Sequence, residues 1–139
     1  NLYIRKQDMS ETKGKILVVE DEEILLTALR EELESGGYQV EGATDGIDGL
    51  EKTKAFKPDL ILLDLLMPKM DGMEMLQKLK ADSEIRDVPV VILTNLSDYE
   101  KISEALSLGA MDYLVKANYK LEDLLEKVST VMARKAESS

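Results

Sequence analysis

Short runs of aliphatic residues, spaced along the chain and separated by helical patterns, restrict this sequence to a small set of folds. Four such runs cover Ile16–Val19, Leu60–Leu63, Val88–Leu93 and Met111–Val115. The first three consist almost entirely of Val, Ile and Leu, which is typical of parallel strands buried on both faces. A further stretch at 38–41 alternates apolar and polar residues, as a half-exposed edge strand does.

Amphipathic stretches separate these runs and predict five helices. The stretches cover residues 22–35, 46–56, 73–79, 97–109 and 121–132. On the first helix, Leu25, Leu29 and Leu33 form one apolar stripe. Asp45 is the expected N-cap of the second helix, and a capping-box pattern at 97–100 opens the fourth. Strands and helices therefore alternate along the chain.

This alternation predicts an α/β fold. Right-handed crossovers place the five strands in one parallel sheet with helices on both faces. The edge character of the second strand favours the flavodoxin-like (βα)5 arrangement with strand order 2-1-3-4-5. We expect a single domain at 14–134, an N-terminal remnant or disordered segment at 1–13 and a C-terminal tail at 135–139.

The composition removes several kinds of chemistry. The sequence has neither cysteine nor histidine. Disulfides, thiolate zinc sites and cysteine nucleophiles are excluded, and so are the Ser-His-Asp triad and the most common general base. Any chemistry of this chain must therefore use carboxylates, lysine, hydroxyl groups and the backbone.

The charge of the chain bears on its partners and its location. A formal net charge of −10 predicts no direct binding to nucleic acid and none to an anionic membrane surface. No apolar run approaches the length of about 20 residues that a membrane helix needs. We expect a cytoplasmic protein as the default.

Polar side chains follow the strands at the edge of the sheet where open α/β folds bind ligands. Glu20 and Asp21 follow the first strand, and Asp64, Thr94 and Lys116 follow the third, fourth and fifth. Crowded carboxylates need a cation or must take up protons, and oxygen ligands without His or Cys favour Mg²⁺. A carboxylate beside Mg²⁺ and an ammonium group is suited to accept a phosphoryl group.

Each of these residues also has a plainer interpretation. Acidic residues favour the first turn of a helix, so Glu20 and Asp21 could serve only to cap the first helix. Asp64 could be an ordinary loop residue, and Lys116 could be solvated, as most lysines are. The convergence of five polar side chains on one rim favours a functional site.

Four segments of the chain resemble the receiver domain of response regulators in two-component signalling. They are ILVVEDE at 16–22, PDLILLDLLMPKMDG at 58–72, PVVILT at 89–94 and GAMDYLVK at 109–116. Each segment alone is a weak signal, whereas the four at the right spacing are specific. The resemblance covers about residues 14–134.

The resemblance implies a role for each residue at the acidic rim. Asp64 would take a phosphoryl group from the phosphohistidine of a sensor histidine kinase or of a phosphotransfer protein. Asp21, Asp64 and the backbone carbonyl of Leu66 would bind Mg²⁺, with Glu20 acting largely through water. Lys116 would pair with Asp64 and then with the phosphoryl oxygens.

A conformational switch is also implied by the resemblance. The Thr94 hydroxyl would move toward the phosphoryl group, and the Tyr113 ring would turn inward to fill the space. From its local sequence alone, Tyr113 could equally be a packing residue. The implied function is a phosphorylation-dependent signalling switch that changes its partner-binding face, and not an enzyme; the downstream protein target cannot be read from the sequence.

The chain departs from the family pattern at a few positions. Ala117 stands after Lys116, where the family usually has a cis proline, so we expect a trans bond or a rearranged loop there. Asn95 follows Thr94 at a position where the family more commonly has a smaller residue, which predicts a narrower entrance to the pocket. Leu66 and Leu96 are both bulky and apolar, and we expect them to exclude the hydrolytic water and prolong the life of the phosphoryl group.

Two other functions compete with the signalling switch. An aspartyl-phosphate phosphatase or transferase also uses an Asp nucleophile after a strand, but usually carries a second Asp two positions later, where this chain has Leu66. A pseudo-receiver that only docks partners is the second alternative. The complete acidic set with Thr94 and Lys116 argues against it, whereas Ala117 keeps it open.

Overall fold

A single five-stranded sheet forms the centre of the computed structural model, which describes residues 12–95, 99–116 and 120–138. The strands are β1 (Lys15–Val19), β2 (Gln39–Ala43), β3 (Leu60–Asp64), β4 (Val90–Thr94) and β5 (Asp112–Val115). They are all parallel and lie in the order β2-β1-β3-β4-β5. The predicted flavodoxin-like order is therefore confirmed.

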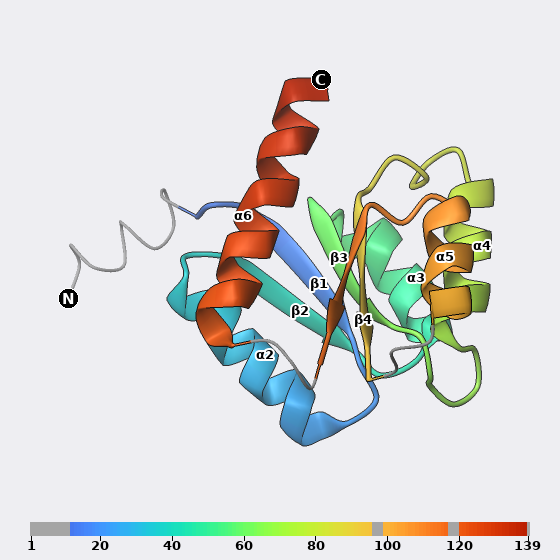
Figure 1. Cartoon of the computed structure of the whole chain (residues 1–139), viewed down its shortest axis with the longest axis horizontal. Helices are drawn as coiled ribbons and strands as arrows, with labels where there is room; N and C mark the ends of the chain where they lie inside the picture. Colours follow the sequence, from blue (N-terminus) through green and yellow to red (C-terminus); the bar gives the residue numbers. More distant parts are fainter. Residues whose placement is uncertain (1–11, 96–98, 117–119, 139) are drawn as a thin grey trace.

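Helices cover both faces of this sheet. They are α2 (Glu23–Ser35), α3 (Gly46–Phe56), α4 (Gly72–Ala81), α5 (Tyr99–Ser107) and α6 (Leu121–Ser138). Figure 1 shows α2 and α6 on one face, and α3, α4 and α5 on the other. The last helix continues past residue 134, where the sequence placed the end of the domain. Among the described residues, no helix is both long and apolar enough to cross a bilayer.

The two faces of the sheet each carry a core of their own. Ile16 and Val18 pack in the core beneath α2 and α6, whereas Leu17 and Val19 pack in the core beneath α3, α4 and α5. Successive residues of a strand point to opposite faces, so a strand covered on both sides must be apolar throughout. This requirement explains the unbroken aliphatic runs of the sequence.

Local signals set the helix boundaries. Asp45 caps α3 as expected, because its Oδ1 accepts the Asp48 N–H at 2.9 Å. The buried stripe of α2 is formed by Leu26 with Leu29 and Leu33, while Leu25 is only partly buried at its side. The stripe predicted from the sequence therefore began one residue too early, at Leu25 instead of Leu26. Residues three and four positions apart both lie on one face of a helix, so the pattern fits either leucine.

Several predictions from the sequence lie outside the described residues. They concern the capping box that starts at residue 97, the water-excluding role of Leu96, the backbone at Ala117 and the segment 1–11. These remain predictions, as do the domain boundaries at 14 and 134.

Candidate functional site

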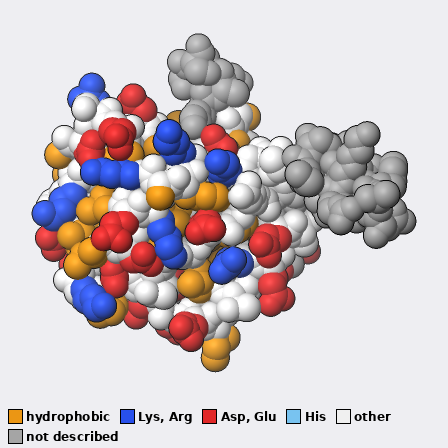
Figure 2. All heavy atoms as spheres, turned by 180° about the vertical axis from the view of Figure 1, so that it is seen from behind, with side chains coloured by type: hydrophobic (Ala, Val, Ile, Leu, Met, Phe, Trp, Pro, Cys, Tyr) orange, Lys and Arg blue, Asp and Glu red, His pale blue; other side chains and the backbone are white. Residues whose placement is uncertain are grey.

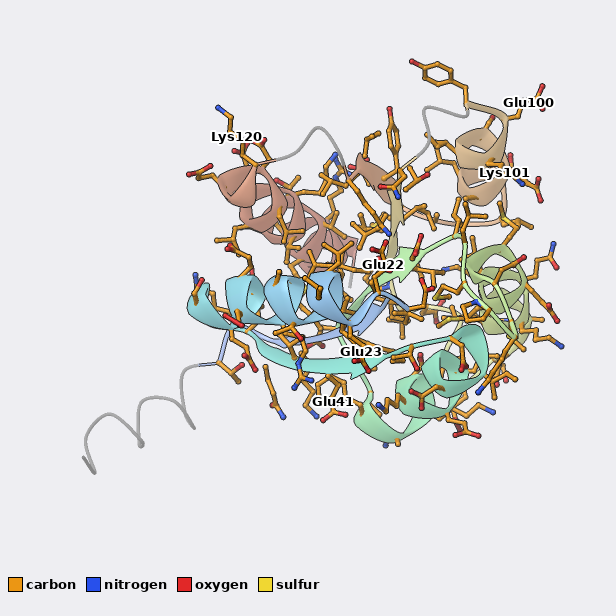
Figure 3. The ribbon with its side chains drawn as sticks, turned by 90° about the horizontal axis from the view of Figure 1, so that it is seen from below. Glu22, Glu23, Glu41, Glu100, Lys101 and Lys120 are labelled. Atoms are coloured by element: carbon orange, nitrogen blue, oxygen red, sulfur yellow. The ribbon has the colours of Figure 1, made fainter. Side chains whose placement is uncertain are left out.

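The carboxyl ends of four strands surround a small pocket of about 180 Å³. Its lining consists of Asp21, Glu22, Asp64, Leu66, Thr94, Asn95 and Lys116. Figure 3 looks onto this end of the sheet, where Glu22 lies near the centre, and Glu100 and Lys101 lie farther out on α5. The structure thus brings together the side chains that the strand ends predicted.

Asp64 is the last residue of β3, and its side chain is held by two donors. The residue is only 6% exposed. Its Oδ2 lies 3.1 Å from the Lys116 ammonium, and its Oδ1 accepts the Leu66 N–H at 3.3 Å. Oxygens of Glu20, Asp21 and Asp64 all lie within 4.8 Å of one another. Three carboxylates at this spacing form a donor set that fits a hard divalent cation.

Lys116 contacts two of the three carboxylates. Its ammonium lies 2.5 Å from Glu20 Oε1 as well as 3.1 Å from Asp64 Oδ2, and its side chain is 7% exposed. The Lys116 N–H donates to the Thr94 carbonyl at 2.7 Å, which extends the pairing of β4 and β5 to the edge of the pocket. The sequence anticipated the pairing with Asp64, but not the closer contact with Glu20, which has no local sequence signal.

Burial and charge shift the acid–base behaviour of this pair. Burial raises the pKa of the Glu20 carboxyl to about 7, with hydrogen bonds from Lys116 and the Glu22 N–H acting against the increase and the Asp64 charge adding to it. Burial works to lower the pKa of Lys116, but its hydrogen bonds to Glu20 and Asp64 and their charges outweigh this effect, so the pKa is raised. The Lys116 ammonium therefore stays charged between the Glu20 and Asp64 side chains.

Thr94 and Tyr113 lie on neighbouring strands and on the same face of the sheet. Tyr113 is opposite Ile92 in the β4–β5 register, and Thr94 lies two residues beyond Ile92. Thr94 is buried at the pocket, while the partly buried Tyr113 ring packs against the core beneath α3, α4 and α5. The two side chains therefore lie on one face of the sheet, on adjacent strands.

Leu66 and Asn95 lie at the mouth of the pocket. Leu66 is 56% exposed although it is apolar, and Asn95 is also exposed. Both line the pocket with Asp64. Sequence reasoning identified these two positions, but it missed Glu22, whose N–H donates to Glu20 Oε2 at 3.1 Å.

Comparison of the sequence with models of known protein families shows which family has this fold and acidic pocket. The model of the response regulator receiver domain matches residues 16–129. The chain belongs to this family. Together with the parallel fold, the match makes the chain a receiver domain of two-component response regulators.

Individual relatives of this receiver domain agree with the match. The "DNA-binding dual master transcriptional regulator RpaA" of Synechocystis is 36% identical over 86% of this chain and 49% of its own length. The "probable transcriptional regulator ycf27" of Porphyridium aerugineum is 40% identical over 88% of this chain and 49% of its own. This chain thus spans about half the length of the curated relatives it matches.

A solved structure shows the same fold. The signal receiver domain of a histidine kinase from Syntrophus aciditrophicus is 36% identical, with a TM-score of 0.78 over 86% of this chain and 90% of that one. The family match at residues 16–129 contains the acidic rim and all of the sheet except Lys15, the first residue of β1.

The prediction that excluded nucleic acid as a direct partner is wrong for this class of protein. RpaA is named as DNA-binding and ycf27 as a probable transcriptional regulator. The net charge of −10 belongs to the present residues alone and carries no information about the half of each relative outside the match. On the face in Figure 2, acidic and basic side chains are interspersed, so net charge is also a poor guide to local potential.

Proposed function

We propose that Asp64 accepts a phosphoryl group from the phosphohistidine of a sensor histidine kinase or a phosphotransfer protein, and that Mg²⁺ is required. The observation that carries this proposal is the position of Asp64, within 4.8 Å of two other carboxylates and 3.1 Å from the Lys116 ammonium. The domain then acts as a signalling switch and not as an enzyme with turnover. A cytoplasmic location belongs to the same proposal.

The donor set of the pocket supports the metal requirement. Asp21 and Asp64 would hold Mg²⁺ together with the Leu66 backbone carbonyl, and Glu20 would act largely through water. When bound, Mg²⁺ supplies positive charge to the oxygens of the transferring phosphoryl group. The excess of carboxylates over ammonium groups at this rim gives the site its affinity for a cation.

The transfer itself requires little from the protein beyond position and charge. An Asp64 carboxylate oxygen attacks phosphorus, the phosphorus–nitrogen bond to the donor imidazole breaks, and the imidazole leaves on the partner protein. Lys116 already lies beside Asp64 and stabilises the phosphoryl oxygens after transfer. Because these 139 residues contain no histidine, the donor imidazole must lie outside them.

The proposed change in the partner-binding face arises from movement of the Thr94 and Tyr113 side chains. The Thr94 hydroxyl moves toward the phosphoryl oxygens, and the Tyr113 ring occupies the space on the same face of the sheet. Their position on adjacent strands and on one face of the sheet supports this coupling, since the Tyr113 ring packs against the core to which α5 contributes Ala105. The surface formed by α5, β5 and α6 is the proposed contact for the downstream target.

An intact-mass measurement tests the proposal. The purified chain is incubated with a small phosphodonor and Mg²⁺, and we expect a stable gain of one phosphoryl group. The gain should be absent from Asp64→Asn and in the presence of a chelator. Continuous release of phosphate would instead indicate an enzyme, and the absence of any gain would indicate a domain that only docks partners.

A further inference from the structure

The loop at 65–71 joins β3 to α4 and contains Leu66. Gly72, which follows the loop, contacts the residue at its start. The Gly72 N–H donates to the Leu65 carbonyl at 2.9 Å. A Cβ atom at Gly72 would lie 2.1 Å from the Asp64 carbonyl oxygen, which is far inside any allowed contact. The backbone at Asp64 therefore needs glycine at this position.

A second glycine holds the same loop from a different element. Gly46 is the first residue of α3, and its N–H donates to the Met70 carbonyl at 2.8 Å. A Cβ atom here would lie 2.7 Å from that carbonyl oxygen and 2.7 Å from Met70 Cγ. A backbone carbonyl cannot rotate away as the end of a side chain can, so any side chain at Gly46 must displace the loop.

Other contacts make the loop depend further on the start of α3. Lys69 has a φ of 64°, a left-handed conformation that is rare outside glycine and asparagine. Its ammonium lies 3.7 Å from Oδ2 of Asp45, the N-cap of α3. The loop is thus held by the Gly46 hydrogen bond and by this ion pair, although α3 contributes no side chain to the acidic pocket.

We propose that Gly46 is a positioning residue for cation binding and phosphoryl acceptance at Asp64. Because Gly46 has no side chain, the backbone of Met70 can lie close to it. This contact fixes the path of the loop and therefore the position of the Leu66 backbone beside Asp64. This inference rests on the proposed function of Asp64 and adds to it a residue on an element outside the pocket. Displacing the loop weakens the cation site without removing any of its carboxylates.

Gly46→Ala and Gly49→Ala form a matched pair for the test. Both place one methyl group on α3, but the Gly49 methyl would meet Met75 Sδ at 2.7 Å and Cε at 2.9 Å, which belong to a flexible side chain. Calorimetric titration with Mg²⁺ gives the dissociation constant of each folded variant, and urea unfolding in chelator gives its stability. We expect Gly46→Ala to bind Mg²⁺ at least about fivefold more weakly than the wild type.

The expected result for Gly49→Ala is a dissociation constant within about twofold of the wild type, whatever its stability. A purely structural role for Gly46 would lower the stability of Gly46→Ala and leave Mg²⁺ affinity unchanged, which would overturn the inference. If the wild type itself bound no Mg²⁺ and gained no phosphoryl group, the function proposed for Asp64 would fail first, so the two failures are distinguishable.

Hydrogen exchange on the wild type provides a test that needs no variant to fold. Coupling between two sites is reciprocal, so cation binding at the pocket must strengthen the Gly46–Met70 hydrogen bond. We expect Mg²⁺ to slow exchange of the Gly46 amide by at least about fivefold. The Gly49 amide, which donates to the Asp45 carbonyl at 2.9 Å, is the internal control and should not respond. Equal responses of the two amides would contradict the inference.

Discussion

At the scale of single residues, the Lys116 ammonium balances two buried acids at once. It lies 2.5 Å from Glu20 and 3.1 Å from Asp64, and all three side chains are nearly inaccessible to solvent. Removing one partner from such a buried group is costly because the remaining charges lose their compensation. A carboxyl group can relieve that loss only by taking up a proton.

Lys116→Met should therefore destabilise the metal-free domain in a pH-dependent manner. We expect a loss of about 3 kcal/mol in unfolding free energy near pH 8, and a smaller loss near pH 6, where Glu20 can become protonated. Urea denaturation at the two pH values measures it. Lys78→Met, at an exposed lysine of α4, is the control. An equal loss at both pH values would contradict this account.

We predict that Leu66 prolongs the life of the phosphoryl group proposed at Asp64. It is an exposed apolar residue at the mouth of the pocket, where it can exclude the attacking water. Leu66→Asn should accelerate loss of the phosphoryl group about tenfold, equivalent to about 1.4 kcal/mol of activation free energy. Intact mass followed over time gives the rate. Ile24→Asn, at an exposed residue that does not line the pocket, should leave the rate unchanged.

At the scale of elements, β2 is an edge strand whose outer side is partly covered by a lysine. The Gln39 N–H and the Ala43 carbonyl pair toward β1, so the backbone groups of Gly42 face the open edge. The Lys52 ammonium donates to the Gly42 carbonyl from α3. A charged group on an exposed edge opposes pairing with another chain.

Removing this cover should promote self-association. Lys52→Ala is expected to form more dimer or aggregate than the wild type at high concentration, as measured by sedimentation velocity. Lys78→Ala is matched to it, because each variant loses one positive charge and one ion pair four residues away, Lys52–Asp48 or Lys78–Glu74. If both variants self-associate equally, net charge and not the β2 edge is responsible.

Elements with strong local signals could be predicted from the sequence. The aliphatic runs identified the buried strands, the alternation at 38–41 identified the edge strand β2, and Asp45 was recognised as a cap. The rim of carboxylates followed from topology alone, because parallel strands end at one edge. These features depend on neighbours in sequence or on the strand order.

Contacts between distant segments could not be predicted. The pairing of Lys116 with Glu20 joins residues 96 positions apart, and the approach of Met70 to Gly46 depends on the path of a loop. Glycine at 46 and 72 is compatible with an ordinary turn as well as with a close backbone contact. Only the three-dimensional arrangement separates these possibilities.

At the scale of the whole molecule, protonation of Glu20 links stability, pH and cation binding. Its folded-state pKa of about 7 lies above the ordinary value of 4.5. A raised carboxyl pKa gives stability that is complete below about pH 4.5 and is lost as the pH rises through about 7. A cation that binds the ionised site should restore stability where it has been lost.

Magnesium should thus stabilise the domain more at high pH. Apparent Mg²⁺ affinity is expected to be about tenfold weaker near pH 6 than near pH 8, because a proton on Glu20 competes with the cation. The rise in melting temperature on adding Mg²⁺ at each pH checks this. Glu20→Gln, which cannot titrate, should show little pH dependence. A rise that is equal at both pH values in the wild type would contradict the link.

The parallel arrangement of the strands also determines how the molecule can be handled. The start of β1 and the end of α6 lie at the end of the sheet opposite the acidic pocket (Figure 1). A surface anchor attached beyond α6 would leave the pocket facing bulk solution. Immobilised protein is therefore suited to direct measurement of kinase docking, since the support lies on the side where no phosphoryl chemistry is proposed.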